Sequence, residues 1–268
     1  MTDRMRRAVL GGALGGALGG ALAAVAAAFA CSPVSTDPNS VLALQLDPPV
    51  LPSIVIHDSL HKPSGALDSL HATAYNAQGA PVPTAPIRFL VIRGRDTVTV
   101  DSISGQVVGD TVGLAQVLAY VGGLQTLPQP VHVVLAPDSL SPLDSTHYVL
   151  DYNRGTLRDT LFALRVRLLH ITGTDTTGVT PYRLDYAFVP PPPNTNLDPA
   201  MVQIVNAARR PQLVDTTASS GSSTLYLLAT LLADTVTDTV YVDVSAARPD
   251  GTPVPGSPVH LRIDLHIH

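Results

Sequence analysis

The chain has 268 residues and a formal net charge of −5, with 45% hydrophobic but only 14% charged residues. All 21 acidic residues are Asp, every basic residue except Lys62 is Arg, and there are 24 Pro and 20 Gly. This composition excludes long solvated helices and coiled coils. The acidic net charge excludes sequence-independent nucleic-acid binding, which needs a basic surface. The single cysteine excludes a disulfide framework or a cysteine-rich metal site.

The first 30 residues have the layout of an export signal. Arg4, Arg6 and Arg7 precede an uncharged apolar run over residues 8–30, and Cys31 follows. The junction Ala28-Phe29-Ala30-Cys31 resembles the lipobox of bacterial lipoproteins, whose cysteine is acylated, although Leu is usual where Ala28 stands. We therefore interpret residues 1–30 as a signal peptide, Cys31 as a site of lipidation by palmitate-like chains, and residues 31–40 as a tether.

Two other interpretations of this segment remain open. Ala28-x-Ala30 is also an ordinary cleavage motif, which would release a secreted protein. The run over residues 8–30 is also long enough to span a bilayer as a retained helix. Cleavage before Cys31 would remove three Arg and one Asp, and so change the net charge from −5 to −7.

Beyond Val41, apolar and polar residues alternate with a period of two, as in half-buried strands. Gly, Pro and Asp separate these runs, which favours an all-β fold of two tandem antiparallel Ig-like β-sandwiches. We place them at residues 41–152 and 153–268, and we expect Pro190–Pro193 to form a rim loop because proline lacks an N–H donor. Strands are predicted over residues 67–75, 87–92, 97–100, 106–108, 114–121, 131–135, 162–171, 182–189, 201–205, 225–231, 240–246 and 259–267.

The first half also has a characteristic spacing of turn and strand residues. It comprises Ala72-x-Ala74-Tyr75-Asn76-Ala77-Gln78-Gly79-Ala80-Pro81, then Ile87-x-Phe89-x-Val91, then Gly109-Asp110-x-x-Gly113-x-Ala115. This spacing resembles the bacterial Ig-like (Big-type) domains of invasin- and intimin-type surface proteins, over residues 41 to about 136, with a weaker echo at residues 242–256. The chain lacks the Trp and the disulfide of antibody domains, so aliphatic burial must hold both sandwiches together.

The C-terminal segment alternates polar and aliphatic residues. His260, Arg262, Asp264, His266 and His268 should share one face of a strand. His266 and His268, with Asp264 as a third ligand, could chelate zinc or copper. We interpret the segment instead as the polar face of a terminal strand, since Arg262 would repel a cation, and we predict no metal and no cofactor.

Aspartates gather in the predicted loops, where calcium binding competes with turn capping. No segment matches a known calcium loop, and the repeated Asp-Thr pairs favour an Asp that caps a turn before a strand. The residues concerned are Asp96, Asp101, Asp110, Asp175, Asp234, Asp238 and Asp250.

Enzymatic motifs are missing: the chain contains no Gly-x-Ser-x-Gly, no His-Glu-x-x-His and no Walker loop. The sequence therefore predicts a non-catalytic lipoprotein, exported to the bacterial cell envelope and held on a membrane by its lipid. Its expected role is structural or adhesive, toward a protein or glycan partner and not toward nucleic acid. Two alternatives are an accessory subunit whose sheet edges add strands to a partner, and an Asp-dependent enzyme without a recognisable motif.

Overall fold

The computed structural model describes residues 37, 39–152, 160–189, 202–229 and 237–267. Every regular element in these ranges is a strand, and none of them contains a helix that could cross a membrane. The strands are β1 (Ala43–Leu46), β2 (Ser53–Val55), β3 (Ala72–Tyr75), β4 (Arg88–Arg93), β5 (Val98–Val100), β6 (Val107–Gly109), β7 (Gly113–Val121), β8 (Leu124–Gln125), β9 (Gln129–Val134), β10 (Ser139–Pro142), β11 (His147–Tyr152), β12 (Thr160–Thr172), β13 (Asp175–Gly178), β14 (Arg183–Phe188), β15 (Val202–Val205), β16 (Val214–Thr216), β17 (Ser222–Ala229), β18 (Thr237–Ser245) and β19 (Val259–Ile267).

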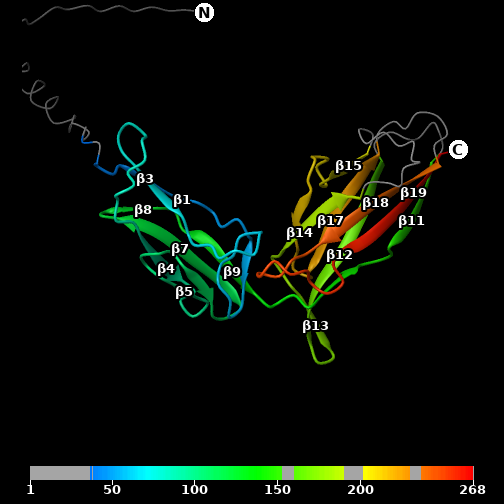
Figure 1. Cartoon of the computed structure of the whole chain (residues 1–268), viewed down its shortest axis with the longest axis horizontal. Coiled ribbons are helices and arrows are strands. Elements are labelled where there is room, and N and C mark those ends of the chain that lie inside the picture. Colours follow the sequence, from blue (N-terminus) through cyan, green and yellow to red (C-terminus); the bar gives the residue numbers. More distant parts are fainter. Residues whose placement is uncertain (1–36, 38, 153–159, 190–201, 230–236, 268) are drawn as a thin grey trace, which may run out of the picture.

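The strands form two sandwiches that lie end to end (Figure 1). In the first sandwich, the sheet β2-β9-β7-β4 faces two strand pairs, β1-β3 and β5-β6. Their inward side chains share one core, which contains Phe89 but is otherwise aliphatic among the described residues. The outermost pair of the sheet, β2 and β9, is parallel, whereas the other pairs of this sandwich are antiparallel.

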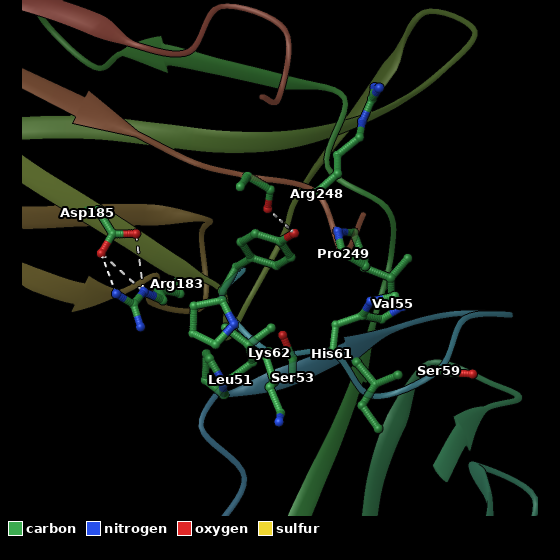
Figure 2. Close-up of a pocket in the computed structure, with 15 residues that line it drawn as sticks. Leu51, Ser53, Val55, Ser59, His61, Lys62, Arg183, Asp185, Arg248 and Pro249 are labelled. Carbon is green, nitrogen blue, oxygen red and sulfur yellow. Dashed lines mark hydrogen bonds and ion pairs between the residues drawn. The ribbon is translucent and has the colours of Figure 1, made fainter. Parts of the chain in front are cut away.

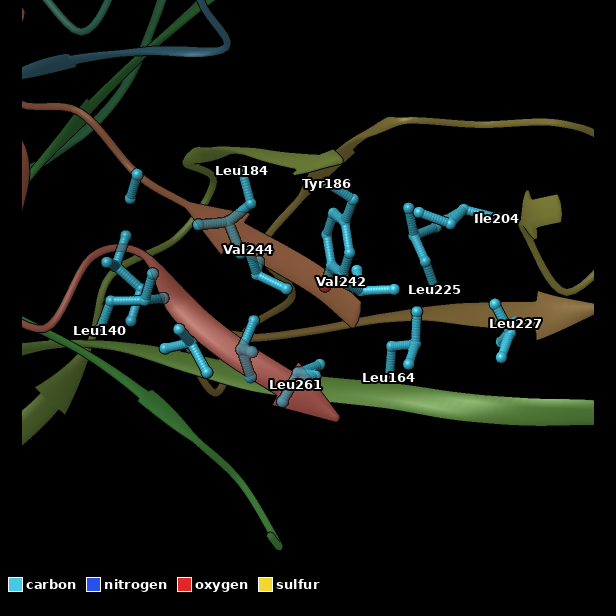
Figure 3. Packing of buried hydrophobic residues seen from close by; sticks show 14 of the residues in the cluster. Leu140, Leu164, Leu184, Tyr186, Ile204, Leu225, Leu227, Val242, Val244 and Leu261 are labelled. Atoms are coloured by element: carbon cyan, nitrogen blue, oxygen red, sulfur yellow. The ribbon is translucent and has the colours of Figure 1, made fainter. Parts of the chain in front are cut away.

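The second sandwich packs the sheet β10-β12-β17-β15 against the sheet β11-β19-β18-β14-β16. Four strands that correspond to A, B, E and D thus face the three that correspond to C, F and G, which is the arrangement of an Ig-like fold. Figure 3 shows how side chains from both sheets interdigitate in the core, among them Leu164, Tyr186 and Leu261. Tyr186 satisfies its buried hydroxyl by a hydrogen bond of 2.7 Å with Ser223 Oγ.

The predicted strands and the all-β class are confirmed, but the predicted boundary at residue 152 is wrong. Both β10 and β11 pair with strands of the second sandwich, β12 and β19 respectively, so that sandwich begins at Ser139. The prolines in this stretch favour a linker, but Pro142 lies at the end of an edge strand, where a missing N–H is tolerated. Pro190–Pro193 lie outside the described residues.

One seven-residue turn recurs four times, at residues 61–67, 75–81, 205–211 and 247–253. In each copy the first and seventh residues form a β-bridge, the second N–H donates to the sixth carbonyl, and the fifth N–H donates to the second carbonyl. The fifth residue has a positive φ, of 84° at Gly65, 74° at Gly79, 59° at Arg209 and 82° at Gly251. This left-handed conformation explains why glycine occupies three of the four positions.

The two sandwiches share buried residues where they meet. The parallel register pairs Ile54 with Val133 and Val55 with Val134. Ile54 and Val133 are buried in the first core, whereas Val55 and Val134 belong to the second core. Because successive side chains of a strand point to opposite faces, the ends of β2 and β9 contribute to both cores at once.

A second contact at this junction joins two copies of the recurring turn. Gly65 of the first sandwich lies so close to the 247–253 turn of the second that a Cβ there would be 2.7 Å from the Asp250 carbonyl. Glycine is therefore required at Gly65 both by its backbone conformation and by its neighbour, whereas a Cβ at Gly79 would meet nothing within 4 Å.

These two glycines provide a matched test of the junction. We expect Gly79→Ala to lower the free energy of unfolding by about 1 kcal/mol, from backbone strain alone. Gly65→Ala has the same strain and must also displace the Asp250 backbone, so it should lose roughly 1–3 kcal/mol more. Urea unfolding of the two variants measures the difference. Equal losses in the free energy of unfolding would show that the contact between Gly65 and the Asp250 backbone does not restrain the junction.

Candidate functional site

Two of the predicted site residues, Cys31 and His268, lie outside the described residues. The others lie where the alternation predicts: Leu261, Ile263 and Leu265 point inward and are fully buried, so Asp264 and His266 project from the outer face of β19. The predicted polar face is therefore confirmed as far as the structure describes it.

Asp264 is the centre of a compact hydrogen-bond network on that face, and it is only 8% exposed. Its Oδ1 accepts hydrogen bonds from Arg262 Nε at 2.9 Å and from Thr239 Oγ1 at 2.7 Å. His147 Nε2, on the parallel neighbour β11, lies 2.7 Å from its Oδ2. Burial alone would raise the pKa of Asp264, but the bonds from Arg262, His147 and Thr239 outweigh it and hold the pKa well below its ordinary value.

This network already uses both carboxylate oxygens that the metal hypothesis would need. In the part of the chain that the structure describes, no group of three or more His, Cys, Asp or Glu is placed to hold a metal ion. Chelation by His266 and His268 stays the alternative to the polar-face interpretation, because His268 lies outside that part.

Four other histidines each pair with a single aspartate, and the described histidines do not gather into one cluster. His61 lies 3.1 Å from Asp58, and His71 lies 3.1 Å from Asp68. The corresponding distance in the second sandwich is 2.7 Å both for His170 with Asp138 and for His260 with Asp243. Each pair joins neighbouring loops or strands, so the arrangement is that of local braces.

Two of the predicted loop aspartates, Asp101 and Asp250, cap turns as the sequence predicts. Asp101 Oδ1 accepts hydrogen bonds from the N–H groups of Ser104 at 2.7 Å and Ile103 at 2.9 Å, and these bonds lower the pKa of Asp101. Asp250 does the same for the N–H and hydroxyl of Thr252, again with a lowered pKa. Asp234, one of the calcium candidates, lies outside the described residues.

A crevice lies where the two sandwiches meet (Figure 2). Ser53, Val55 and His61 line it from the first sandwich, and Arg183 and Arg248 line it from the second. Its volume of about 50 Å³ is far below the roughly 300–1,000 Å³ of a typical small-molecule site. The crevice is therefore part of the joint and not a substrate pocket.

Two polar side chains of the crevice, Tyr182 and Arg183, are engaged within the second sandwich. Tyr182 donates its hydroxyl to the carbonyl of Ala247 at 2.7 Å, and burial raises the pKa of Tyr182. Arg183 forms an ion pair with Asp185 at 2.6 Å. These bonds fix the end of the second sandwich that faces the first.

Sequence reasoning missed this junction, although a signal was present. Ile54-Val55 and Val133-Val134 place two apolar residues side by side in strands that otherwise alternate. Adjacent apolar residues are typical of strands that are covered on both faces. The pattern could have indicated that β2 and β9 are buried on both sides at these points.

Comparisons with known proteins identify no family. No protein-family model matches the chain, and no curated protein matches it. The chain is similar at low TM-scores to solved structures that include an adhesin, an S-layer protein and a cadherin. The adhesin InvE of Yersinia pseudotuberculosis has 16% identity and a TM-score of 0.34 over 86% of this chain and 61% of that chain. The S-layer protein SbsC has 12% identity and a TM-score of 0.29 over 84% of this chain and 28% of that chain.

The third similar structure is mouse cadherin-23, with 11% identity and a TM-score of 0.26 over 84% of this chain and 64% of that chain. The chain thus spans less than two thirds of the length of each of these three structures. At such TM-scores the similarities assign neither a family nor an activity to the chain.

The Asp264 network predicts a pH-dependent loss of stability. Asp264→Asn should lower the free energy of unfolding by about 2 kcal/mol at neutral pH, since it weakens charge-assisted hydrogen bonds at a buried position. A lowered folded-state pKa contributes stability above the unfolded value of about 4, and this contribution is lost as the pH falls toward the folded value. The difference between variant and wild type should therefore shrink below about pH 4.

Urea unfolding at several pH values measures this difference. Asp243→Asn is the matched control on the same face, because within the described residues Asp243 pairs with the exposed His260, and it should cost less than about 0.5 kcal/mol. A pH-independent effect of Asp264→Asn, or an equal effect of the control, would contradict the network's role.

Proposed function

We propose that this chain is a non-catalytic lipoprotein of the bacterial cell envelope, in which two fused Ig-like sandwiches form a stiff structural or binding arm. The observation that carries the proposal is the shared junction. Domains in one chain usually move relative to each other unless a hydrophobic interface holds them. Here Val55 and Val134 of the first sandwich are buried in the second core, with exposed fractions of 7% and 3%.

Bending at the junction would have to expose these side chains. Burial of one Val side chain contributes on the order of 1.5–3 kcal/mol. The close approach of Gly65 to Asp250 adds a steric restraint beside the two valines. A tandem held in this way can transmit position and force, as a spacer or an adhesive arm requires.

The position of Cys31 gives the arm a direction. Cys31 precedes β1 by twelve residues, which can span at most about 40 Å. In Figure 1, β1 lies in the first sandwich, and the end of β19 lies at the far end of the second. A lipid on Cys31 would therefore keep the first sandwich near the membrane and present the second away from it.

The arrangement of polar groups supports the non-catalytic part of the proposal. The carboxylates of Asp264, Asp185 and Asp101 form hydrogen bonds or ion pairs with a histidine, an arginine and the backbone of a turn, respectively. A broad hydrolase screen on the purified chain should find no turnover. Turnover that one Asp→Asn change abolishes would favour the enzyme alternative instead.

Lipidation at Cys31 is tested by metabolic labelling with a palmitate analogue in a bacterial host. We expect label on the wild-type chain, none on Cys31→Ala, and release of that variant from the membrane fraction. Cys31→Ala removes only the acceptor thiol and leaves the apolar run over residues 8–30 intact. An unlabelled wild type would contradict lipidation and leave the secreted and the retained-helix interpretations. Membrane retention of Cys31→Ala would support the retained helix.

Stiffness of the arm is measured by pulsed electron paramagnetic resonance. Because Cys31 is the only cysteine, a Cys31→Ser background allows spin labels at Ala43→Cys and Gln203→Cys, which are exposed positions in different sandwiches. We expect one narrow distance distribution, broadened by Gly65→Ala and unchanged by Gly79→Ala. A broad distribution in the unmodified background would refute the stiff arm.

A further inference from the structure

The outer face of the first sandwich's sheet is apolar and exposed. Leu90 and Ile92 of β4 are 43% and 42% exposed, and Leu114 and Tyr120 of β7 are 48% and 37% exposed. Leu118, the register partner of Leu90, lies on this face between them and is buried by its neighbours, at 6% exposed. We call these five residues the apolar face. Apolar surface gathered in this way marks an interaction site more often than isolated exposed residues do.

The second sandwich provides an internal comparison. The equivalent strands β14, β18 and β19 cover their outer face with polar side chains, which form the pairs Arg183–Asp185, His260–Asp243 and Arg262–Asp264. Among the described residues of the second sandwich, Val149 of β11 is exposed on the outside of the same sheet beside Asp264, but β14, β18 and β19 carry paired charges where β4 and β7 carry aliphatic side chains. The apolar face is therefore a property of this sandwich and not a general feature of the fold.

Charge around the apolar face is predominantly basic. Arg88, Arg93 and Arg95 lie on β4 and the turn after it, and they are three of the four basic residues between positions 41 and 136. One carboxylate, Asp96, shares that turn, and Asp101 interacts electrostatically with Arg88. No acidic residue occurs in β4, β7 or β9. A second copy that docked face to face would set basic rim against basic rim, which is unfavourable. An occupant whose own rim carries carboxylates would match this surface.

The edge of the sheet is less available than its face. The Phe89 N–H on the open side of β4 donates to the Ser102 carbonyl at 3.0 Å. Arg95 Nε donates to the Val91 carbonyl at 3.4 Å. These bonds already use main-chain groups that an added strand would need. An occupant therefore lies on the face and does not extend the sheet.

A hollow continues the apolar face on the β9 side. Gln116 and Leu114 of β7 pair with Pro130 and His132 of β9. Pro130 and His132 also line a hollow of about 180 Å³, together with Pro49 and Leu51. A cavity of about 150 Å³ is large enough to take up a benzene molecule, so this hollow has room for one aromatic or branched side chain of an occupant.

From this geometry we propose that the outer face of β4, β7 and β9 docks a partner protein with an apolar centre, one aromatic or aliphatic anchor side chain and a rim of Asp and Glu. The inference adds a partner class to the proposed binding role. It depends on neither the lipid on Cys31 nor the stiffness of the arm.

Two synthetic peptides of twelve residues serve as probes. Both alternate Leu, Val and one Phe with charged residues, which are Asp in one peptide and Lys in the other. In fluorescence anisotropy with the wild-type chain, we expect the Asp peptide to bind at least tenfold more tightly than the Lys peptide. Raising the salt concentration should weaken the binding of the Asp peptide, because its contacts with the arginines are screened.

Variants locate the binding. The double variant Leu90→Ser, Leu114→Ser should bind the Asp peptide at least tenfold more weakly. The double variant Arg93→Gln, Arg95→Gln should lose the preference for the Asp peptide over the Lys peptide. Tyr241→Ser, on the outer face of the second sandwich, is the matched control and should have no effect. Circular dichroism checks that each variant is folded, and all the variants except the control alter exposed side chains.

Three outcomes would overturn the proposal: no binding of the Asp peptide, equal binding of both peptides, or binding that the Leu90 and Leu114 changes leave intact. A dimer in sedimentation equilibrium that Leu114→Ser dissolves would assign the face to a second copy instead. None of these outcomes would alter the labelling of Cys31 or the spin-label distances, so failure here is distinguishable from failure of the proposed function.

Discussion

The architecture depends on one constraint, the burial of Val55 and Val134 by a sandwich other than their own. A strand places successive side chains on opposite faces, and a sheet at the surface of a sandwich normally leaves its outer side chains to solvent. At the ends of β2 and β9 the second sandwich covers that outer side. The two domains are thereby joined through their cores, and the glycine at position 65 allows the turn of one to approach the backbone of the other.

The charged side chains, in contrast, form their hydrogen bonds and ion pairs with groups of the same turn or of an adjacent strand. Asp264 is held by Arg262 two residues away and by His147 on a parallel neighbour, whereas Asp101 and Asp250 hold their own turns. Such groups stabilise strand pairing and turn geometry. The crevice at the junction has little free volume, which fits a joint better than a catalytic cleft.

The two sandwiches differ most in what their outer sheets present to solvent. The second carries paired charges on the outer face of β14, β18 and β19, whereas the first shows aliphatic side chains beside a predominantly basic rim. The core and the strand order set the fold, but they do not require this difference. The polar outer face of the second sandwich fits a surface that stays in water, and the apolar outer face of the first fits the docking role that we propose for it.

The sequence by itself determined the all-β class, the position of most strands, the turns at residues 75–81 and 247–253 and the polar face of β19, because each follows from local alternation or from the need for glycine at positive φ. Local pattern could not place β10 and β11 in the second sandwich, since strand pairing joins residues more than 100 positions apart, such as His147 and Arg262. The tertiary structure also decided that Asp264 is buried while His260 on the same face is exposed, because β11 and β18 flank Asp264 on both sides. For the same reason it decided that Val55 and Val134 point into a second core, since only the docking of one sandwich on the other determines which apolar residues lose their contact with water.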